Sequence, residues 1–299
     1  MTSSEPTSPQ PGSPTAWDLF RTPTSRETSG KTTQILATAV PVTVPHRQVL
    51  HWPSNGHDPE IELQAYVWPG PGEQSPTVLL IHGWEWQAGR WEAFIGPLRA
   101  AGWRVAAYDA PAHGRSEGTM STLLDYAASI RSVAEAVGGV RALIGHSFGG
   151  MAALWLLAEG HGVARPLLGV ERVVSLSAAT DVEFLLRSST RFPAADEDTR
   201  QRFREEFRQN IGALPADFNA AVAGARLSQP ALIAHDQRDL VVPYEHAQAY
   251  VAALPRAELL TTSGLGHRFI LRDAAVVQRA VDFLAPAQQA NSNGLLANA

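Results

Sequence analysis

The stretch RALIGHSFGGMAAL, residues 141–154, decides the fold of this chain. A strand is predicted at residues 141–144, and an apolar helix is predicted from Phe148 onward. The pattern G-x-S-x-G lies between them, and glycines two residues to either side of Ser147 let the helix pack against the strand. Such a turn projects the serine hydroxyl above the sheet. The sequence therefore predicts Ser147 as a nucleophile, the alternative being an incidental serine in a glycine-rich turn.

Strands and helices alternate through the rest of the chain. Strands are predicted at residues 61–68, 77–81, 104–108, 140–144, 172–176, 231–234 and 258–261, and helices at residues 90–101, 121–137, 148–158, 244–254 and 273–284. Because parallel strands need crossover connections, this alternation favours one α/β domain with a mostly parallel sheet and flanking helices.

The alternation stops once, at residues 178–229, where charged helical sequence replaces the strands. We expect a small helical lid inserted after a strand there, since ligands bind beyond strand C-termini in open α/β sheets; ordinary solvated flanking helices are the alternative.

The core then comprises residues 16–177 and 230–285. Residues 1–15 are expected to form a disordered tail rich in Pro, Ser and Thr, and residues 286–299 a flexible polar tail. The apolar segment 17–20 is expected to dock on the body.

Composition excludes several classes of function. The balance of 24 basic and 29 acidic residues gives a net charge of −5, which disfavours nucleic acid or an anionic membrane as the main partner. The chain has no cysteine, so disulfides, thiolate metal sites and a cysteine nucleophile are excluded. No apolar run is long enough for a membrane span, and the N-terminus does not resemble a signal peptide, so we expect a cytoplasmic protein. No nucleotide-binding or metal-ligand spacing is present, so no cofactor and no metal are expected.

Two further motifs accompany the Ser147 turn. HGW at residues 82–84 follows a predicted strand, and DAPAHGRS at residues 109–116 follows the next. Together the three motifs resemble the α/β-hydrolase family over residues 61–284, and within it the small-cap esterase-like members. Ala112 stands where that family usually has glycine. The resemblance implies that Asp109 anchors its loop and that His82 fixes the turn at Gly83, both as structural residues.

The resemblance also orders the catalytic groups as serine, then acid, then histidine. His267, in a glycine-rich loop after the last strand, is the expected general base. Asp239, in a D-x-V-V-P pattern after the strand at 231–234, is the preferred acid, with Asp181 second and Asp236 third. We interpret the remaining histidines, such as His46, His51, His57, His161 and His246, as ordinary surface residues.

Acyl transfer also needs hydrogen-bond donors where the oxyanion forms. The resemblance places them at the backbone N–H groups of Phe148, after the nucleophile, and of Trp84, after the first motif strand. Trp86 and His146 are candidate residues of the substrate pocket, with aromatic core packing as the alternative.

These expectations describe a serine hydrolase that cleaves carboxylic esters of small molecules through a Ser147–His267–Asp239 triad and an acyl-enzyme. One alternative is a ligand sensor or binding protein that retains the triad. Another is a triad hydrolase of thioester, amide or C–C bonds. Dehalogenation and epoxide hydrolysis are disfavoured, because the nucleophile in those reactions is an aspartate.

Overall fold

The computed structural model describes residues 14–24, 30–51, 56–188 and 197–285. The tails expected at residues 1–15 and 286–299 lie outside these ranges, apart from residues 14 and 15. Among the described helices, none is long and apolar enough to cross a membrane.

Eight strands form a single sheet in the order β1-β2-β4-β3-β5-β6-β7-β8. β1 pairs with β2 and β2 with β4 in antiparallel fashion, and all other neighbours are parallel, which confirms the mostly parallel sheet. The strands are β1 (Val40–Arg47), β2 (Glu60–Trp68), β3 (Thr77–Ile81), β4 (Arg104–Tyr108), β5 (Ala142–His146), β6 (Arg172–Leu176), β7 (Ala231–Asp236) and β8 (Ala257–Thr262).

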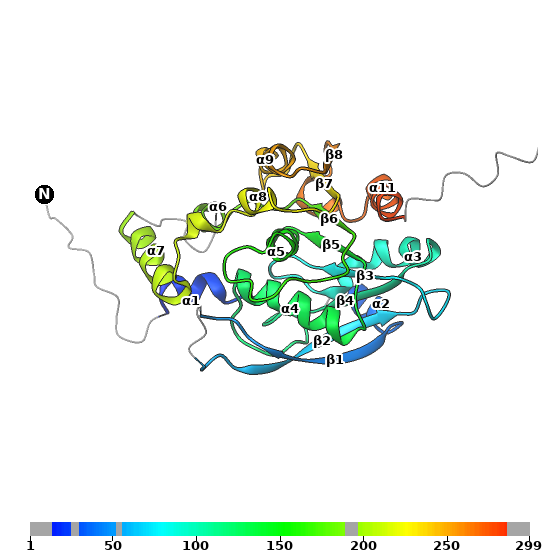
Figure 1. The fold of residues 1–299 in the computed structure, drawn as a ribbon, viewed down its shortest axis with the longest axis horizontal. Helices are drawn as coiled ribbons and strands as arrows, with labels where there is room; N and C mark the ends of the chain where they lie inside the picture. Colours follow the sequence, from blue (N-terminus) through cyan, green and yellow to red (C-terminus); the bar gives the residue numbers. More distant parts are fainter. Residues whose placement is uncertain (1–13, 25–29, 52–55, 189–196, 286–299) are drawn as a thin grey trace, which may run out of the picture.

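Helices cover both faces of this sheet (Figure 1). Buried residues of α4 (Leu123–Ala136), α5 (Phe148–Leu157), α8 (Ala220–Gly224) and α9 (Glu245–Ala253) belong to one core cluster. Those of η1 (Ala88–Trp91), α3 (Glu92–Ala100) and α11 (Ala274–Leu284), with Leu36 of α2 (Gly30–Leu36), belong to the other. In β3, Leu79 and Ile81 join the first cluster, while Val78 and Leu80 join the second. A strand buried on both faces has no polar alternation, which explains its continuous apolar sequence.

The centre of the sheet contains a topological switch point. From β3 the chain moves outward to β4 on one side, then returns past β3 to β5 on the other. The carboxyl ends of β3 and β5 therefore flank the crevice where open α/β sheets bind ligands. β3 ends directly before His82, and β5 ends directly before Ser147, so both sequence motifs reach this crevice.

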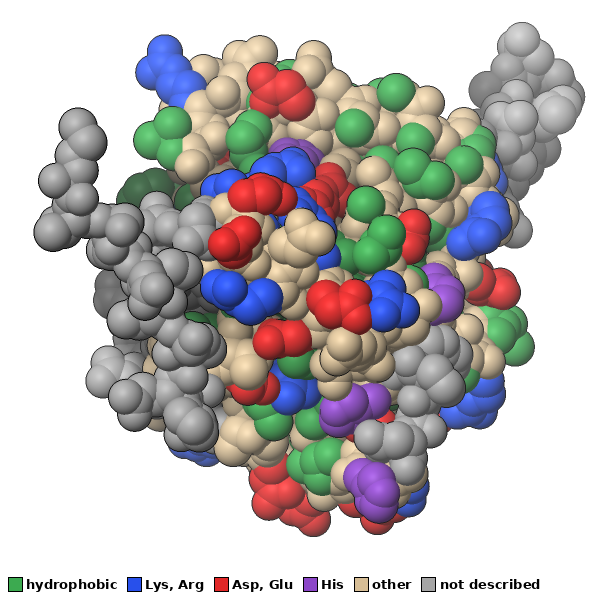
Figure 2. Space-filling model, turned by 90° about the vertical axis from the view of Figure 1, so that its left-hand side faces the viewer, with side chains coloured by type: hydrophobic (Ala, Val, Ile, Leu, Met, Phe, Trp, Pro, Cys, Tyr) green, Lys and Arg blue, Asp and Glu red, His purple; other side chains and the backbone are tan. Residues whose placement is uncertain are grey.

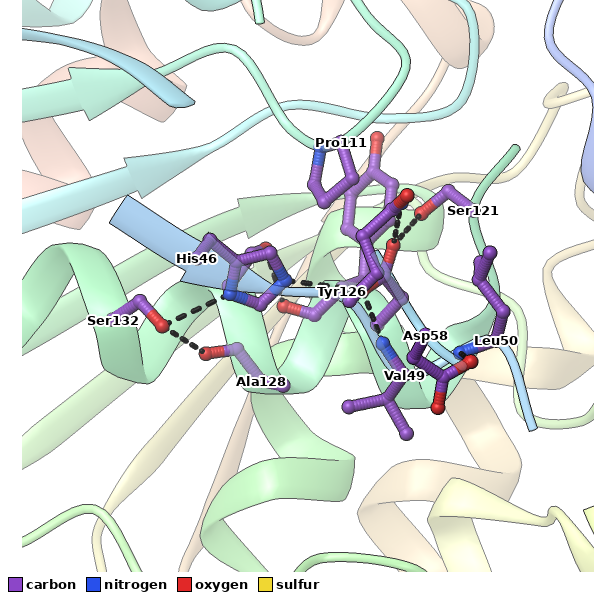
Figure 3. A network of polar contacts seen from close by, with 12 residues as sticks. His46, Val49, Leu50, Asp58, Pro111, Ser121, Tyr126, Ala128 and Ser132 are labelled. Carbon is purple, nitrogen blue, oxygen red and sulfur yellow. Dashed lines mark hydrogen bonds and ion pairs between the residues drawn. The ribbon is translucent and has the colours of Figure 1, made fainter. Parts of the chain in front are cut away.

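The edge strand β1 was not predicted, because Pro41 and Pro45 interrupt its sequence. It is tied to α4 by a buried polar network (Figure 3). The His46 ring contacts the Asp125 carboxylate through Nε2 and the Ser132 hydroxyl through Nδ1, both at 3.0 Å. His46 is buried, so its interpretation as a surface residue is wrong: the carboxylate of α4 satisfies a ring that would otherwise need water.

The described residues between β6 and β7 form α6 (Val182–Ser188), α7 (Glu197–Ile211), η2 (Pro215–Asp217) and α8. The segment 17–20 docks here. It lies in α1 (Ala16–Arg21), beside α7 at the left of Figure 1, where Trp17 packs edge-on against Phe207 with ring centroids 5.2 Å apart. Acidic and basic side chains intermingle on this end of the molecule (Figure 2), in keeping with ion pairs such as Arg208–Glu205.

Candidate active site

Ser147 occupies the sharp turn between β5 and α5. Its backbone has φ 53° and ψ −123°, a left-handed conformation that a residue with a Cβ adopts only under strain. The Ser147 N–H donates to the carbonyl of Leu176 in β6, which holds the turn against the sheet. The predicted strand–turn–helix junction is thus present, with Ser147 as the residue that precedes the first turn of α5.

Gly149 lets α5 approach the end of β3. A Cβ built at this position would lie 2.3 Å from the His82 carbonyl oxygen and 2.5 Å from that of Ile81. One obstacle is the last carbonyl of the central strand β3 and the other is the carbonyl that directly follows it, so a side chain here must push the helix away from the sheet.

We therefore expect Gly149→Ala to lower the free energy of unfolding by about 3 kcal/mol or more, as for a severe core overpacking. Gly96→Ala is the matched control, since a Cβ at Gly96 in α3 meets no atom within 4 Å. That control should gain up to about 1 kcal/mol from the better helix former. Urea denaturation of both variants measures the two effects, and equal stabilities would contradict the close packing of the turn.

His267 lies in the short helix α10 (Gly266–Phe269), next to Asp239 in the loop after β7. Its Nδ1–H donates to Asp239 Oδ2 over 2.8 Å, which leaves Nε2 as the proton acceptor of the neutral ring. Asp239 Oδ1 accepts the backbone N–H groups of Val241 and Val242, each at 2.9 Å. Burial acts to raise the pKa of Asp239, but the hydrogen bond from His267 and these two N–H groups outweigh it, so the pKa is lowered.

The two rival carboxylates have other partners. Asp236 Oδ2 accepts the Thr262 hydroxyl at 2.8 Å and the Leu265 N–H at 2.9 Å, so it fastens the loop that leads to His267 onto β7. Burial opposes ionisation, yet these hydrogen bonds hold the pKa of Asp236 at about 2. Asp181 Oδ1 accepts the Phe184 N–H at the start of α6. Of the three carboxylates, Asp239 is the one in contact with His267.

A pocket of about 320 Å³ opens beside these groups. Ser147, His267, Trp84, Trp86 and Phe148 all line it, so five of the residues predicted from the sequence meet in one place. No hydrogen bond joins Ser147 Oγ to His267 within the described ranges. Unliganded active sites often have such loose contacts, which tighten when substrate binds.

Backbone donors are available on the Ser147 side of the pocket. In the described part of the chain, no hydrogen bond takes up the N–H of Trp84 or of Phe148. A Cβ at Gly83 would lie 3.0 Å from Ser147 Cβ, so the loop that carries Trp84 packs directly against the turn. Two unoccupied N–H groups beside a serine hydroxyl are suited to a developing oxyanion.

His82 fixes the loop that follows β3 and carries the Trp84 N–H group. Its Nδ1–H donates to the Gly83 carbonyl at 2.7 Å, and its Nε2 accepts the Ala110 N–H at 2.9 Å. Burial lowers the pKa of His82 to about 3, so the ring is neutral and both nitrogens are satisfied. Its expected role as a structural residue is confirmed by these contacts.

The loop after β4 is anchored as expected. Asp109 accepts the Ala88 N–H at 2.8 Å and the Arg115 N–H at 2.9 Å, and its carboxylate is fully buried. Ala112, which stands where glycine is usual, has φ 65°. That backbone conformation explains physically why glycine suits the position.

His146 lies behind the pocket rather than in its lining. Its ring stacks on Trp86, with centroids 4.6 Å apart and planes at 14°, and its Nε2–H donates to the His267 carbonyl at 2.9 Å. Burial and the neighbouring His267 ring lower the pKa of His146 well below its usual value. The pair Trp86–His146 therefore supports the backbone that carries His267.

Several pocket residues were not singled out in the sequence. They come from six separate segments and are Phe20, Glu85, Ser121, Thr122, Phe184, Leu185, Ser188, Val241, Val242 and Arg268. Phe20 lies in the apolar segment 17–20, and Val241 and Val242 lie in the D-x-V-V-P pattern, but the sequence did not show that either segment lines the pocket. Among the described residues, no group of three or more His, Asp or Glu side chains is placed to hold a metal ion.

The chain is similar to known hydrolases over most of its length. A protein of Variovorax paradoxus that bears the name of a carbamate hydrolase is 28% identical over 252 residues, which cover 73% of this chain and 93% of that protein. The pimeloyl-[acyl-carrier protein] methyl ester esterase of Methylococcus capsulatus is 29% identical over 229 residues, covering 70% and 87%. An esterase of Pyrococcus furiosus has the same fold, with a TM-score of 0.63 at 19% identity and coverage of 88% and 97%.

A family model described as the alpha/beta hydrolase family matches residues 78–279. The match runs from β3 into α11 and contains Ser147, Asp239 and His267. Because it spans more than half of the sequence, this chain belongs to the alpha/beta hydrolase family.

Proposed function

We propose that the protein is a serine hydrolase that cleaves carboxylic esters of small molecules through an acyl-enzyme. Ser147 is the nucleophile, His267 the general base and acid, and Asp239 the residue that orients His267. One observation carries the proposal: the Asp239–His267 hydrogen bond of 2.8 Å presents the free Nε2 of His267 to the pocket that Ser147 also lines.

In the acylation step, Ser147 Oγ attacks the ester carbonyl carbon while His267 Nε2 accepts the hydroxyl proton. The carbonyl oxygen becomes an oxyanion, which the N–H groups of Trp84 and Phe148 stabilise, each by roughly 3 kcal/mol. Collapse of this intermediate breaks the bond to the alcohol oxygen. His267 then returns its proton to the departing alkoxide, and Asp239 stabilises the transient imidazolium.

In the deacylation step, water takes the place of the alcohol. His267 removes a proton from the water as its oxygen attacks the acyl carbon, and the same N–H groups stabilise the second oxyanion. The bond to Ser147 Oγ breaks, and His267 protonates the serine. The carboxylic acid leaves and the starting state is restored.

The β6–β7 segment, residues 178–229, is proposed as the lid. Phe184, Leu185 and Ser188 of α6 line the same pocket as the catalytic groups, as does Phe20 of α1. A volume of about 320 Å³ is at the lower end for small-molecule sites, which favours short acyl groups. The named activities of the two relatives, on a carbamate and a methyl ester, are both attacks on a carbonyl carbon and agree with this reaction class.

Turnover of p-nitrophenyl esters with acyl chains of about two to eight carbons tests the proposal. We expect a burst of p-nitrophenol followed by steady turnover, fastest with the shorter chains. A protein that reacts once with a fluorophosphonate probe yet turns over no ester in the series would instead be a ligand sensor. Faster cleavage of matched thioesters or amides would move the assignment to those bonds.

A further inference from the structure

A second hollow, of about 160 Å³, adjoins the catalytic pocket. Its lining residues are Trp86, Arg90, Arg268, Phe269, Leu271 and Arg272. Trp86 and Arg268 also line the pocket of Ser147, so the two spaces share a wall. Arg268 directly follows His267 in α10, which places the hollow on the His267 side of the catalytic pocket.

Three arginines around this hollow have no anionic partner among the residues that the structure describes. Within the described ranges, none of the guanidinium groups of Arg90, Arg268 and Arg272 forms an ion pair or donates a hydrogen bond. Arg90 instead stacks over the Trp86 ring, with its guanidinium carbon 4.7 Å from the ring centroid. Some arginines elsewhere on the surface, such as Arg208 and Arg279, are paired with carboxylates, and others, such as Arg99 and Arg226, donate to backbone carbonyl groups.

The positive charges of Arg90, Arg268 and Arg272 repel one another. Burial lowers the pKa of Arg90, and the charges of Arg272 and Arg268 lower it further, with no carboxylate offsetting them. Asp273, next in the chain after Arg272, is engaged in capping α11, where its Oδ1 accepts the N–H groups of Ala275 and Val276. The three arginines therefore concentrate positive charge around this hollow in a chain whose net charge is −5. An anion between them would relieve their repulsion.

The position of the hollow indicates which part of a substrate it would contact. His267 protonates the leaving group, so the alcohol portion must lie beside it, next to Arg268. The catalytic pocket is also lined by Phe20, Phe184 and Leu185, and these apolar side chains suit the acyl portion. Guanidinium groups match the oxygens of a phosphate by paired, charge-assisted hydrogen bonds.

We propose that Arg90, Arg268 and Arg272 bind a phosphate group carried by the leaving alcohol of the substrate. This inference rests on the proposed ester hydrolysis and adds to it the chemical class of the alcohol. Phosphate binding by these arginines would make the protein selective for phosphorylated esters, because the phosphate anchors the leaving group while Ser147 attacks the carbonyl beside it.

The test compares 1-butyrylglycerol 3-phosphate with 1-butyrylglycerol at low ionic strength, where exposed charges are screened least. We expect kcat/KM to be about 30-fold higher for the phosphate ester, a difference within the range of a few charge-assisted hydrogen bonds. In the double variant Arg268→Gln/Arg272→Gln the ratio should fall to within about threefold of one. Arg279→Gln, whose arginine pairs with Glu258 in α11, should keep the wild-type ratio.

Three outcomes would overturn the inference: equal rates for both esters, a ratio that survives the double variant, or a stronger preference for the matched ester with a carboxylate in place of phosphate. Calorimetric titration with inorganic phosphate gives a second readout, with binding expected in wild type and lost in the double variant. If wild type hydrolyses neither ester, the proposed function fails, and the titration still reports whether the arginines bind phosphate.

Discussion

Replacing Ser147 by alanine is expected to lower kcat for p-nitrophenyl butyrate by about 10⁵-fold, which is the scale for loss of a serine nucleophile. The residual rate comes from substrate binding and from the N–H groups of Trp84 and Phe148, which the substitution leaves in place. Steady-state kinetics on purified protein measures the change. A fall of less than about tenfold would contradict the role of Ser147.

The backbone strain at Ser147 supplies a control within the same position. Alanine retains the Cβ and therefore the strain at φ 53° and ψ −123°, whereas glycine removes it. Ser147→Gly should be as inactive as Ser147→Ala but about 1 kcal/mol more stable. Thermal unfolding of the two variants separates loss of the hydroxyl from loss of fold.

Asp239→Asn is expected to lower kcat by about 10⁴-fold with little change in fold. The asparagine oxygen can still accept the N–H groups of Val241 and Val242, which now bind Asp239 Oδ1. Its amide then faces His267 Nδ1 as a donor, so the ring must accept there and carry its proton on Nε2. A protonated Nε2 cannot take the proton of Ser147. The pH–rate profile and kcat of the variant measure this loss.

Asp181→Asn is the matched control, because Asp181 contacts α6 rather than His267. It should lower kcat less than tenfold. If Asp181→Asn instead abolished activity and Asp239→Asn did not, the acid would be Asp181.

The Asp239 carboxylate also makes the free energy of unfolding depend on pH. The folded-state pKa of Asp239 is below its ordinary value, so the ionised form stabilises the fold above the unfolded-state pKa. That contribution is lost as the pH falls through the lowered pKa. The difference in free energy of unfolding between wild type and Asp239→Asn should therefore be full at neutral pH and shrink below about pH 4.

The elements that follow from local pattern were predictable. β3, β4 and β6 have the predicted bounds, because a strand buried on both faces is a continuous apolar run between turn residues. The turn at Ser147 was equally predictable from the sequence. The helix packs closely against the strand at such a junction, and this packing requires the glycines of the motif. β1 was missed because Pro41 and Pro45 are tolerated only at a sheet edge, and edge position depends on the whole topology.

The sequence could not predict those features of the candidate site that depend on contacts between residues far apart in the chain. Asp181 comes after β6, Asp236 ends β7 and Asp239 follows it, so all three carboxylates lie near the carboxyl ends of neighbouring strands. Only their hydrogen bonds show that Asp239 contacts His267, that Asp181 accepts an N–H at the start of α6 and that Asp236 holds the loop before His267. His146 sits beside the nucleophile in sequence, yet its ring turns away to stack on Trp86. The wall formed by Phe20 depends on α1 docking against α7, which no local pattern of either helix specifies.

In the proposed reaction, Ser147 becomes acylated during ester hydrolysis. Rapid acid quenching of wild type with p-nitrophenyl butyrate, followed by proteolysis and mass spectrometry, tests it directly. We expect one butyryl group on the peptide that contains Ser147, formed within the burst and absent in Ser147→Ala. Steady ester turnover with no acylated Ser147 peptide, or with the butyryl group on another residue, would contradict it.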